Sequence, residues 1–211
     1  MKKLILLLAL GSLSVTGFTQ WTAKSNAPDC RYDGCGFSVN NMIYYGLGIT
    51  CTGGQDQSFY KYDPATDTWD TITAFPGPTR RGAFGMTVGS KAYVGMGIAQ
   101  NGNALNDIWE YDPVANTWTQ KNNFPGTGRG FSVTGEVSGK GYLGTGLAYM
   151  QFFNDLWEYV PQTDTWTFKP AFSGGYRFQA SAFSVNGAFY VLCGTDDNGA
   201  MYNDCRKYDP V

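Results

Sequence analysis

The sequence predicts an all-β protein built from four similar units, each a four-stranded antiparallel sheet. Two observations support this fold class: one segment recurs along the chain at an almost constant spacing, and the composition favours short strands and tight turns. Of the 211 residues, 28 are glycine, 16% are aromatic and only 15% are charged. That balance is typical of many short strands and unusual for a helical protein.

The recurring segment is clearest at 106–118, where it reads NDIWEYDPVANTW. Further copies occupy 57–69 and 154–166, and a fourth begins at Asn203. Apolar and polar residues alternate on both sides of a turn marked by proline, which predicts two strands joined by a tight turn. The spacing between copies is 49, 48 and 49 residues, measured at one tyrosine in each: Tyr62, Tyr111, Tyr159 and Tyr208.

Two more strands precede this segment in every repeat. A small, apolar strand rich in glycine follows an arginine, and the next strand ends in glycine, as in YVGMG at 93–97. Four strands in about 50 residues are typical of a propeller blade. We assign the repeats to 25–73, 74–122, 123–170 and 171–211.

Glycine-ended second strands and a late tryptophan resemble the kelch-repeat β-propellers, especially the secreted kelch proteins of bacteria. The resemblance covers the chain from about residue 20 onward and implies a β-propeller. One departure is that Gly-x-Gly closes the second strand in three repeats, whereas the fourth has only Gly194. We interpret the repeated tyrosines and tryptophans as packing between blades, because one sheet cannot bury both of its faces alone.

The two ends of the repeat region leave an open question of ring closure. Residues 20–24, with Trp21, match the strand that ends each later repeat, so this segment is expected to complete the fourth blade and close a four-bladed ring. The alternative is a fragment of a larger propeller. Both interpretations remain open at this point.

The first 19 residues have the pattern of a secretory signal peptide. Lys2 and Lys3 precede the short apolar run at 4–10, and small residues follow. The run is shorter than the ~20 residues that a membrane span needs. We therefore predict a bacterial protein that is secreted or at the cell surface, with no membrane span in 20–211. That mature chain has 13 basic against 17 acidic residues and no basic patch, which argues against nucleic acid as a partner.

Five cysteines in an exported chain predict disulfides. Cys193 and Cys205 lie on consecutive predicted strands of the fourth repeat, where a cross-strand bridge is plausible. A second bridge is expected among the three cysteines of the first repeat, with Cys30 and Cys51 as candidates. The chain has no histidine and no Cys-x-x-Cys pair, so we expect no metal site and no cofactor.

The arginine that opens each repeat is the first candidate for ligand binding. It lies 13 residues before a tyrosine in every repeat, which predicts a ring of guanidinium groups able to hold a carboxylate or an acidic sugar. In the competing interpretation each arginine bridges to backbone or to an acid of a neighbouring blade, such as Asp107, Asp155 or Asp204, because repeated residues mostly serve stacking. The arginines are Arg31, Arg80, Arg129 and Arg177.

The absence of histidine and of known catalytic motifs favours a non-enzymatic module that binds glycan or protein. Its binding face is expected on the loops between second and third strands, at 49–56, 98–105, 147–153 and 195–202. These loops carry aromatic and amide side chains suited to sugar or protein contacts: Gln55, Asn101, Asn103, Tyr149, Phe152 and Tyr202.

An enzymatic alternative depends on Glu136. Its counterparts in the other repeats are Ser38, Thr87 and Ser184, so Glu136 alone places a carboxylate at this level. Beside the arginine ring, a tuned carboxylate supports acid/base chemistry. Some kelch-like propellers act in this way, so the resemblance implies as the alternative a carbohydrate-active enzyme such as a sugar epimerase or mutarotase.

Overall fold

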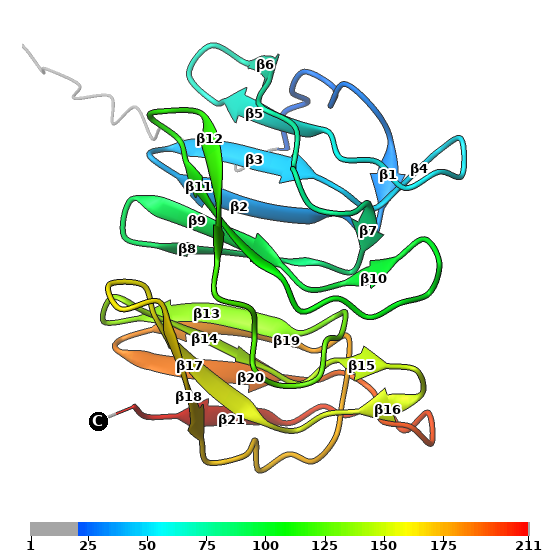
Figure 1. The fold of residues 1–211 in the computed structure, drawn as a ribbon, viewed down its shortest axis with the longest axis vertical. Coiled ribbons are helices and arrows are strands. Elements are labelled where there is room, and N and C mark those ends of the chain that lie inside the picture. Colours follow the sequence, from blue (N-terminus) through cyan, green and yellow to red (C-terminus); the bar gives the residue numbers. More distant parts are fainter. Residues whose placement is uncertain (1–20, 211) are drawn as a thin grey trace, which may run out of the picture.

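Residues 21–210 are described by a computed structural model, in which four antiparallel sheets stand side by side (Figure 1). The arrangement is a β-propeller of four blades, as predicted. No helix long and apolar enough to cross a membrane occurs in this part of the chain. The predicted signal peptide at 1–19 lies outside the described residues.

Each blade follows the order of its strands along the chain, from the innermost strand outward. The first blade consists of β2 (Cys35–Val39), β3 (Met42–Gly46), β5 (Phe59–Asp63) and β6 (Thr68–Thr71). The second consists of β8 (Phe84–Val88), β9 (Lys91–Gly95), β11 (Ile108–Asp112) and β12 (Thr117–Lys121). The third consists of β13 (Val133–Val137), β14 (Lys140–Gly144), β17 (Leu156–Val160) and β18 (Thr165–Lys169). The fourth has β19 (Ser181–Val185), β20 (Ala188–Leu192) and β21 (Cys205–Tyr208).

Short two-residue strands decorate one end of the blades, at the right in Figure 1. They form three small two-stranded sheets: β1 (Arg31–Tyr32) with β4 (Ile49–Thr50), β7 (Arg80–Arg81) with β10 (Ile98–Ala99), and β15 (Leu147–Ala148) with β16 (Gln151–Phe152). We call this end, which also carries the loops between second and third strands, the loop face.

Aromatic rings pack one blade onto the next. The inner strands β2, β8, β13 and β19 neighbour one another in that order. At the first junction, the rings of Phe37 and Tyr44 lie 6.2 and 5.5 Å from the ring of Tyr111. At the second, Tyr93 lies 5.3 Å from Tyr159 in an edge-on contact. Since each contact joins two blades, the repeated tyrosines are core residues, as the sequence indicates.

Backbone hydrogen bonds join the same junctions. The second glycine of each Gly-x-Gly donates its N–H to the carbonyl of the next blade's arginine: Gly48 to Arg80 at 2.8 Å, Gly97 to Arg129 at 2.7 Å and Gly146 to Arg177 at 2.9 Å. These glycines have φ of 83°, 98° and 99°, a left-handed conformation that side chains disfavour. A Cβ at Gly97 would lie 2.8 Å from the carbonyl oxygen of Arg81. The repeat therefore needs glycine here because φ is left-handed and the backbone that follows the arginine of the same repeat passes so close.

The tryptophans of the outer strands cover the spaces between blades. The indole of Trp118 lies 5.3 Å from Phe59, 5.2 Å from Phe75 and 4.8 Å from Tyr111. Its Nε1–H donates to the carbonyl of Thr73 at 2.9 Å. Trp166 repeats this packing at the next junction. Each tryptophan thus fastens its own blade to the outer part of the preceding one.

The predicted closing strand at 20–24 is not part of the fourth sheet. Residues 21–24 form no strand, and the side chain of Trp21 is fully exposed. Instead, the Ser25 N–H donates to Asp67 at 2.9 Å, and Trp69 donates to the Ser25 carbonyl at 3.0 Å. Because Ser25 is held on the first blade, at the other end of the row, the expected pairing with the fourth blade is not formed in this structure.

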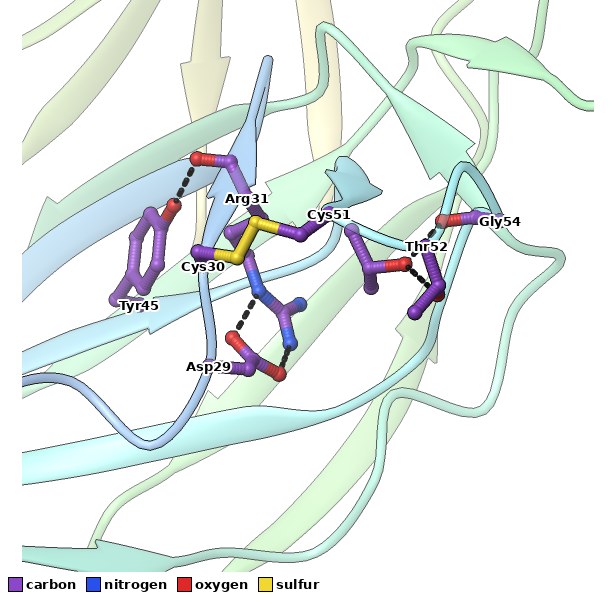
Figure 2. Close-up of a disulfide and its surroundings, with 8 residues drawn as sticks. Asp29, Cys30, Arg31, Tyr45, Cys51, Thr52 and Gly54 are labelled. Atoms are coloured by element: carbon purple, nitrogen blue, oxygen red, sulfur yellow. Dashed lines mark hydrogen bonds and ion pairs between the residues drawn. A yellow bond between two sulfur atoms is a disulfide. The ribbon is translucent and has the colours of Figure 1, made fainter.

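One of the two expected disulfides is present. Cys30 and Cys51 are joined, with Cα atoms 5.6 Å apart, and the bridge links the segment before β1 to the segment after β4 (Figure 2). Cys193 and Cys205 are free and exposed, so the predicted bridge between them is wrong. The register of β20 and β21 explains why this bridge is not formed. Cys205 lies opposite Leu192, and Cys193 follows Leu192 by one residue, so the two cysteines are not opposite each other. Burial raises the pKa of the remaining thiol, Cys35, to about 12.

We expect Trp118→Ala to lower the free energy of unfolding by about 3 kcal/mol, because it removes an indole packed between two blades. Phe168→Ala is the control, since that ring is 57% exposed and should cost under about 1 kcal/mol. Urea unfolding followed by circular dichroism measures both. Equal losses in the two variants would contradict the role assigned to the outer tryptophans.

Candidate functional site

The repeat arginines lie inside the blades. Arg80 is 0% exposed, and both its Nη atoms donate to the Asp107 carboxylate, at 2.6 and 2.7 Å. Nη1 also donates to the Met96 carbonyl at 2.9 Å, and Nε to the Pro78 carbonyl at 3.0 Å. The guanidinium stacks on the Phe75 ring, 4.8 Å from its centroid. The guanidinium of Arg80 therefore presents no exposed surface to a ligand, and its three nitrogens all donate to groups of the protein.

The same arrangement recurs in the third and fourth blades. Arg129 pairs with Asp155 at 2.5 and 2.8 Å and is 1% exposed. Arg177 pairs with Asp204 at 2.6 Å and is 0% exposed. In both cases an aromatic ring lies under the guanidinium, 5.2 Å from Arg129 at Phe124 and 4.9 Å from Arg177 at Phe172.

Arg31 in the first blade has a local variant of this pair. Its carboxylate partner is Asp29, two residues earlier, beside the Cys30–Cys51 bridge (Figure 2). Every repeat arginine thus binds backbone carbonyls and an acid, as the competing interpretation held. Three of the acids are the ones it named, but each belongs to the arginine's own repeat and not to a neighbouring blade. The geometry gives no support to a ring of guanidinium groups that holds an anion.

The paired carboxylates respond to their arginines. Burial alone would raise the pKa of Asp107, but hydrogen bonds and charge from Arg80, together with the Trp109 N–H, lower it below its ordinary value. Hydrogen bonding from Arg177 likewise lowers the pKa of Asp204. Both carboxylates are therefore held in the charged form beside their arginines.

A hollow of about 480 Å³ opens on the loop face, and all four blades contribute to its lining. We call it the loop-face hollow. The residues that determine its chemistry are Asp33, Arg81, Phe131, Tyr149, Phe178 and Gln179.

Polar and aromatic groups stand next to each other in this hollow. Arg81 pairs with Asp33 of the first blade at 3.3 Å, and its side chain is 42% exposed. Tyr149 is 66% exposed, and its hydroxyl accepts the N–H of Ala104 at 3.0 Å. Phe178 makes an edge-on contact with Phe152 at 5.2 Å. The hollow thus offers an exposed ring and a partly exposed ion pair to a ligand.

The backbone around the hollow is left-handed at one position of every repeat. The residue two places after each arginine has positive φ: 54° at Asp33, 62° at Gly82, 59° at Phe131 and 54° at Gln179. This conformation is uncommon for residues other than glycine. Hydrogen bonds from Gly82 N–H to Asp33 and from Phe131 N–H to Gly82, both at 2.8 Å, hold three of these residues together across the blades.

Of the loop residues that the sequence singles out, Tyr149 lines the hollow. The Tyr202 ring stacks on Arg177 at 4.0 Å, and its hydroxyl donates to Asp196 at 2.7 Å. The Asn101 side chain accepts the Asn103 N–H at 3.0 Å within its turn, and Gln55 donates to the Ile98 carbonyl at 3.4 Å. These three side chains are engaged in the loops themselves.

Sequence reasoning missed five residues of the hollow: Asp33, Arg81, Phe131, Phe178 and Gln179. A signal for them exists, because the two positions after the arginine differ in every repeat, while the arginine recurs and the third position after it is always small. They read YD, RG, GF and FQ, at 32–33, 81–82, 130–131 and 178–179. Variation inside an otherwise regular repeat is what a binding surface on a shared scaffold predicts.

Glu136 lies away from the repeat arginines. It is the next-to-last residue of β13, beside the turn, whereas Arg129 precedes the start of that strand. One carboxylate oxygen accepts the Gly139 N–H at 2.6 Å, and the side chain lines a separate hollow between the inner strands together with Ser38, Thr87 and Ser184. The joint site of Glu136 and the arginine ring is therefore not formed.

Comparison with known proteins agrees with this architecture. The Kelch motif family matches residues 96–125. A solved structure described as "Structure of YjhT" is 21% identical and has a TM-score of 0.73. The match covers 90% of this chain and 68% of that one. No curated protein matches. At this identity the likeness to the solved structure shows the fold alone.

Replacing Arg80 by alanine is expected to destabilise the protein by about 3–5 kcal/mol, because the Asp107 carboxylate loses its partner inside the blade. The neighbouring Arg81→Ala is a matched control, expected to cost at most about 1 kcal/mol because its ion pair is partly exposed. Urea unfolding of both variants distinguishes these outcomes. An equal loss at Arg81 would contradict the separation of structural and surface arginines.

The Arg80–Asp107 pair should also make stability depend on pH. The folded-state pKa of Asp107 lies below 3.8, so the pair contributes fully above about pH 4, and its contribution is lost as pH falls from there through the lowered pKa. In Asp107→Asn the decline in unfolding free energy between about pH 5 and pH 2 should be shallower than in the parent. Parallel profiles for the two proteins would argue against this linkage.

Proposed function

We propose that this four-bladed β-propeller is a secreted binding module whose loop-face hollow holds an oligosaccharide. The match to the Kelch motif at residues 96–125 supports a binding role. The kelch propeller fold supports a role in binding generally. What we propose beyond this is that the ligand is an oligosaccharide and that it binds at the loop face.

The observation that carries the proposal is the mixture of groups in the loop-face hollow. The exposed ring of Tyr149 suits stacking against a sugar, and the Arg81–Asp33 pair with Gln179 offers hydrogen-bond donors and acceptors to hydroxyl groups. A concave hollow of about 480 Å³ is in the size range of small-molecule sites. A flat, extended surface would have favoured a protein partner instead.

An enzymatic role has less support. The acid that lines the loop-face hollow is Asp33, and it is already paired with Arg81. Glu136 occupies the other hollow with its carboxylate bound to the turn of its own hairpin. The sugar epimerase or mutarotase alternative needs an acid beside a free arginine, and these residues do not provide that pair.

Export is part of the proposal. The charged and apolar pattern of residues 1–19 favours secretion or display at the cell surface. The Cys30–Cys51 bridge supports it, because such bonds persist in oxidising compartments outside the cytosol.

We expect Tyr149→Ala to weaken oligosaccharide binding by about tenfold, which corresponds to ~1.4 kcal/mol, because it removes the exposed ring of the hollow. A panel of immobilised neutral and acidic oligosaccharides identifies a ligand for the parent protein. Titration calorimetry with that oligosaccharide then compares the variants.

Phe168→Ala serves as the control, since it removes an equally exposed ring from the outer strand β18 of the same blade. Binding lost equally in both variants would place the ligand elsewhere. Binding to extracellular proteins but to no oligosaccharide would replace the glycan with a protein partner. An anomeric conversion by the parent that Glu136→Gln abolishes would favour the enzyme.

A further inference from the structure

The hairpin of β15 and β16, at the right of Figure 1, has a turn unlike those of the other repeats. β15 ends at Ala148 and β16 begins at Gln151, so only Tyr149 and Met150 connect the two strands. We call these two residues the hairpin tip. The equivalent loops of the other repeats have three connecting residues, the last of which is glycine, and they lie at 51–53, 100–102 and 197–199.

Both residues of the hairpin tip have a left-handed backbone, with φ of 48° at Tyr149 and 74° at Met150. A two-residue hairpin turn of this kind favours Asn-Gly, because the left-handed conformation disfavours larger side chains. In the three longer loops the left-handed residue is glycine, with φ of 88° at Gly53, 86° at Gly102 and 76° at Gly199. Of these four loops, the third repeat therefore has the strained one.

Burial does not compensate for this strain. Tyr149 is 66% exposed and Met150 is 85% exposed. The Tyr149 hydroxyl accepts the N–H of Ala104, in the loop of the preceding blade, at 3.0 Å. The ring is thus held in place while its surface stays open to solvent. Strained backbone that presents exposed apolar side chains is typical of a functional surface.

Both residues of the hairpin tip line the loop-face hollow, and much of the remaining lining is also apolar. Asp33 and Arg81 are the charged residues of this lining, and they pair with each other at 3.3 Å. Because their charges offset each other, the hollow favours a ligand without net charge. The other apolar residues of the lining are Ile98, Phe131, Leu147 and Phe178.

We propose that the hairpin tip binds the apolar face of a neutral pyranose whose hydroxyl groups are equatorial, as in a β-1,4-linked glucan. This inference rests on the oligosaccharide binding proposed above. In such a sugar the axial C–H bonds point to the two faces of the ring, and the hydroxyl groups point outward around its rim. One face then lies on Tyr149 and Met150, while rim hydroxyl groups reach the Arg81–Asp33 pair.

The same surface disfavours two closely related sugars. An axial hydroxyl group, as in a β-1,4-linked mannan, points toward the hairpin tip. There the Tyr149 hydroxyl is already bonded to Ala104 and Met150 offers only a thioether, so the axial group loses its hydrogen bonds to water without replacement. A carboxylate on the sugar meets Arg81 already paired with Asp33.

Three matched tetrasaccharides test the ligand class by titration calorimetry. Cellotetraose should bind at least about tenfold more tightly than β-1,4-mannotetraose, which differs in the orientation of its 2-hydroxyl groups, and than the β-1,4-linked tetramer of glucuronic acid. Equal binding of the three, or binding of a different oligosaccharide only, would overturn this inference and leave the proposed function standing. A parent protein that binds no oligosaccharide at all would overturn both.

Two substitutions at one position test the hairpin tip itself. Met150→Gly and Met150→Ala both remove the thioether and should weaken cellotetraose binding by about fivefold. Only glycine relieves the left-handed backbone, so the urea midpoint of Met150→Gly should lie above those of Met150→Ala and the parent. Val114→Ala is the binding control, because Val114 is 88% exposed in the turn between β11 and β12. Equal midpoints for the two Met150 variants, or parental binding in both, would contradict a strained tip that contacts the sugar.

Discussion

A four-stranded sheet with apolar residues on both faces cannot be stable as a single layer, and this constraint governs the molecule. Each blade covers one face of its neighbour, through tyrosine rings near the axis and tryptophan rings near the outer edge. Backbone bonds from glycine to arginine add a directional link, which fixes how far one blade is displaced from the next. Within residues 21–210, the inner strand of the fourth blade therefore keeps Phe183 and Val185 exposed, at 61% and 50%.

The arginines of the buried arginine–carboxylate pairs, which stabilise the blades, directly precede in the chain the residues that line the loop-face hollow. Inside its blade, each guanidinium donates hydrogen bonds to a carboxylate and a backbone carbonyl and lies against an aromatic ring. The next residues along the chain emerge at the loop face and line the hollow. A buried, paired charge thus anchors the segment whose neighbouring residues differ between repeats, and this anchoring holds the mouth of the hollow in place.

Much of the fold could be predicted from the constant spacing of the repeated residues. The period at Tyr62 and its equivalents, the glycine after the second strand and the late tryptophan are each tied to a contact that every blade must make. The disulfide between Cys30 and Cys51 was among the candidates because three cysteines lie in the first repeat, and the pairing of β1 with β4 brings these two together. The predicted bridge between Cys193 and Cys205 was wrong because the sequence alone does not reveal a one-residue offset in the pairing of β20 with β21.

The site was harder to predict than the fold, and the arginines show why. A residue type repeated at a constant place signals either a ring of ligands or a structural pair, and spacing alone cannot tell burial from exposure. Glu136 misled for a related reason: its departure from serine and threonine is real, but the strand order puts it at the turn end of β13, far along the strand from Arg129. Residues such as Phe131 and Gln179 were missed because they differ from their counterparts in the other repeats, whereas a search for repeats selects the positions that are alike.

The bond between glycine and the arginine carbonyl has a consequence for how such chains change. Its acceptor is a main-chain atom, and its donor needs only the absence of a side chain. This bond therefore does not distinguish one blade from another, whereas the side chains at each junction do, as with Tyr44 against Tyr111 and Tyr93 against Tyr159. Shuffling whole repeats would move the pairs YD, RG, GF and FQ around the axis and give new combinations in the hollow, provided that the side chains at each new junction fit.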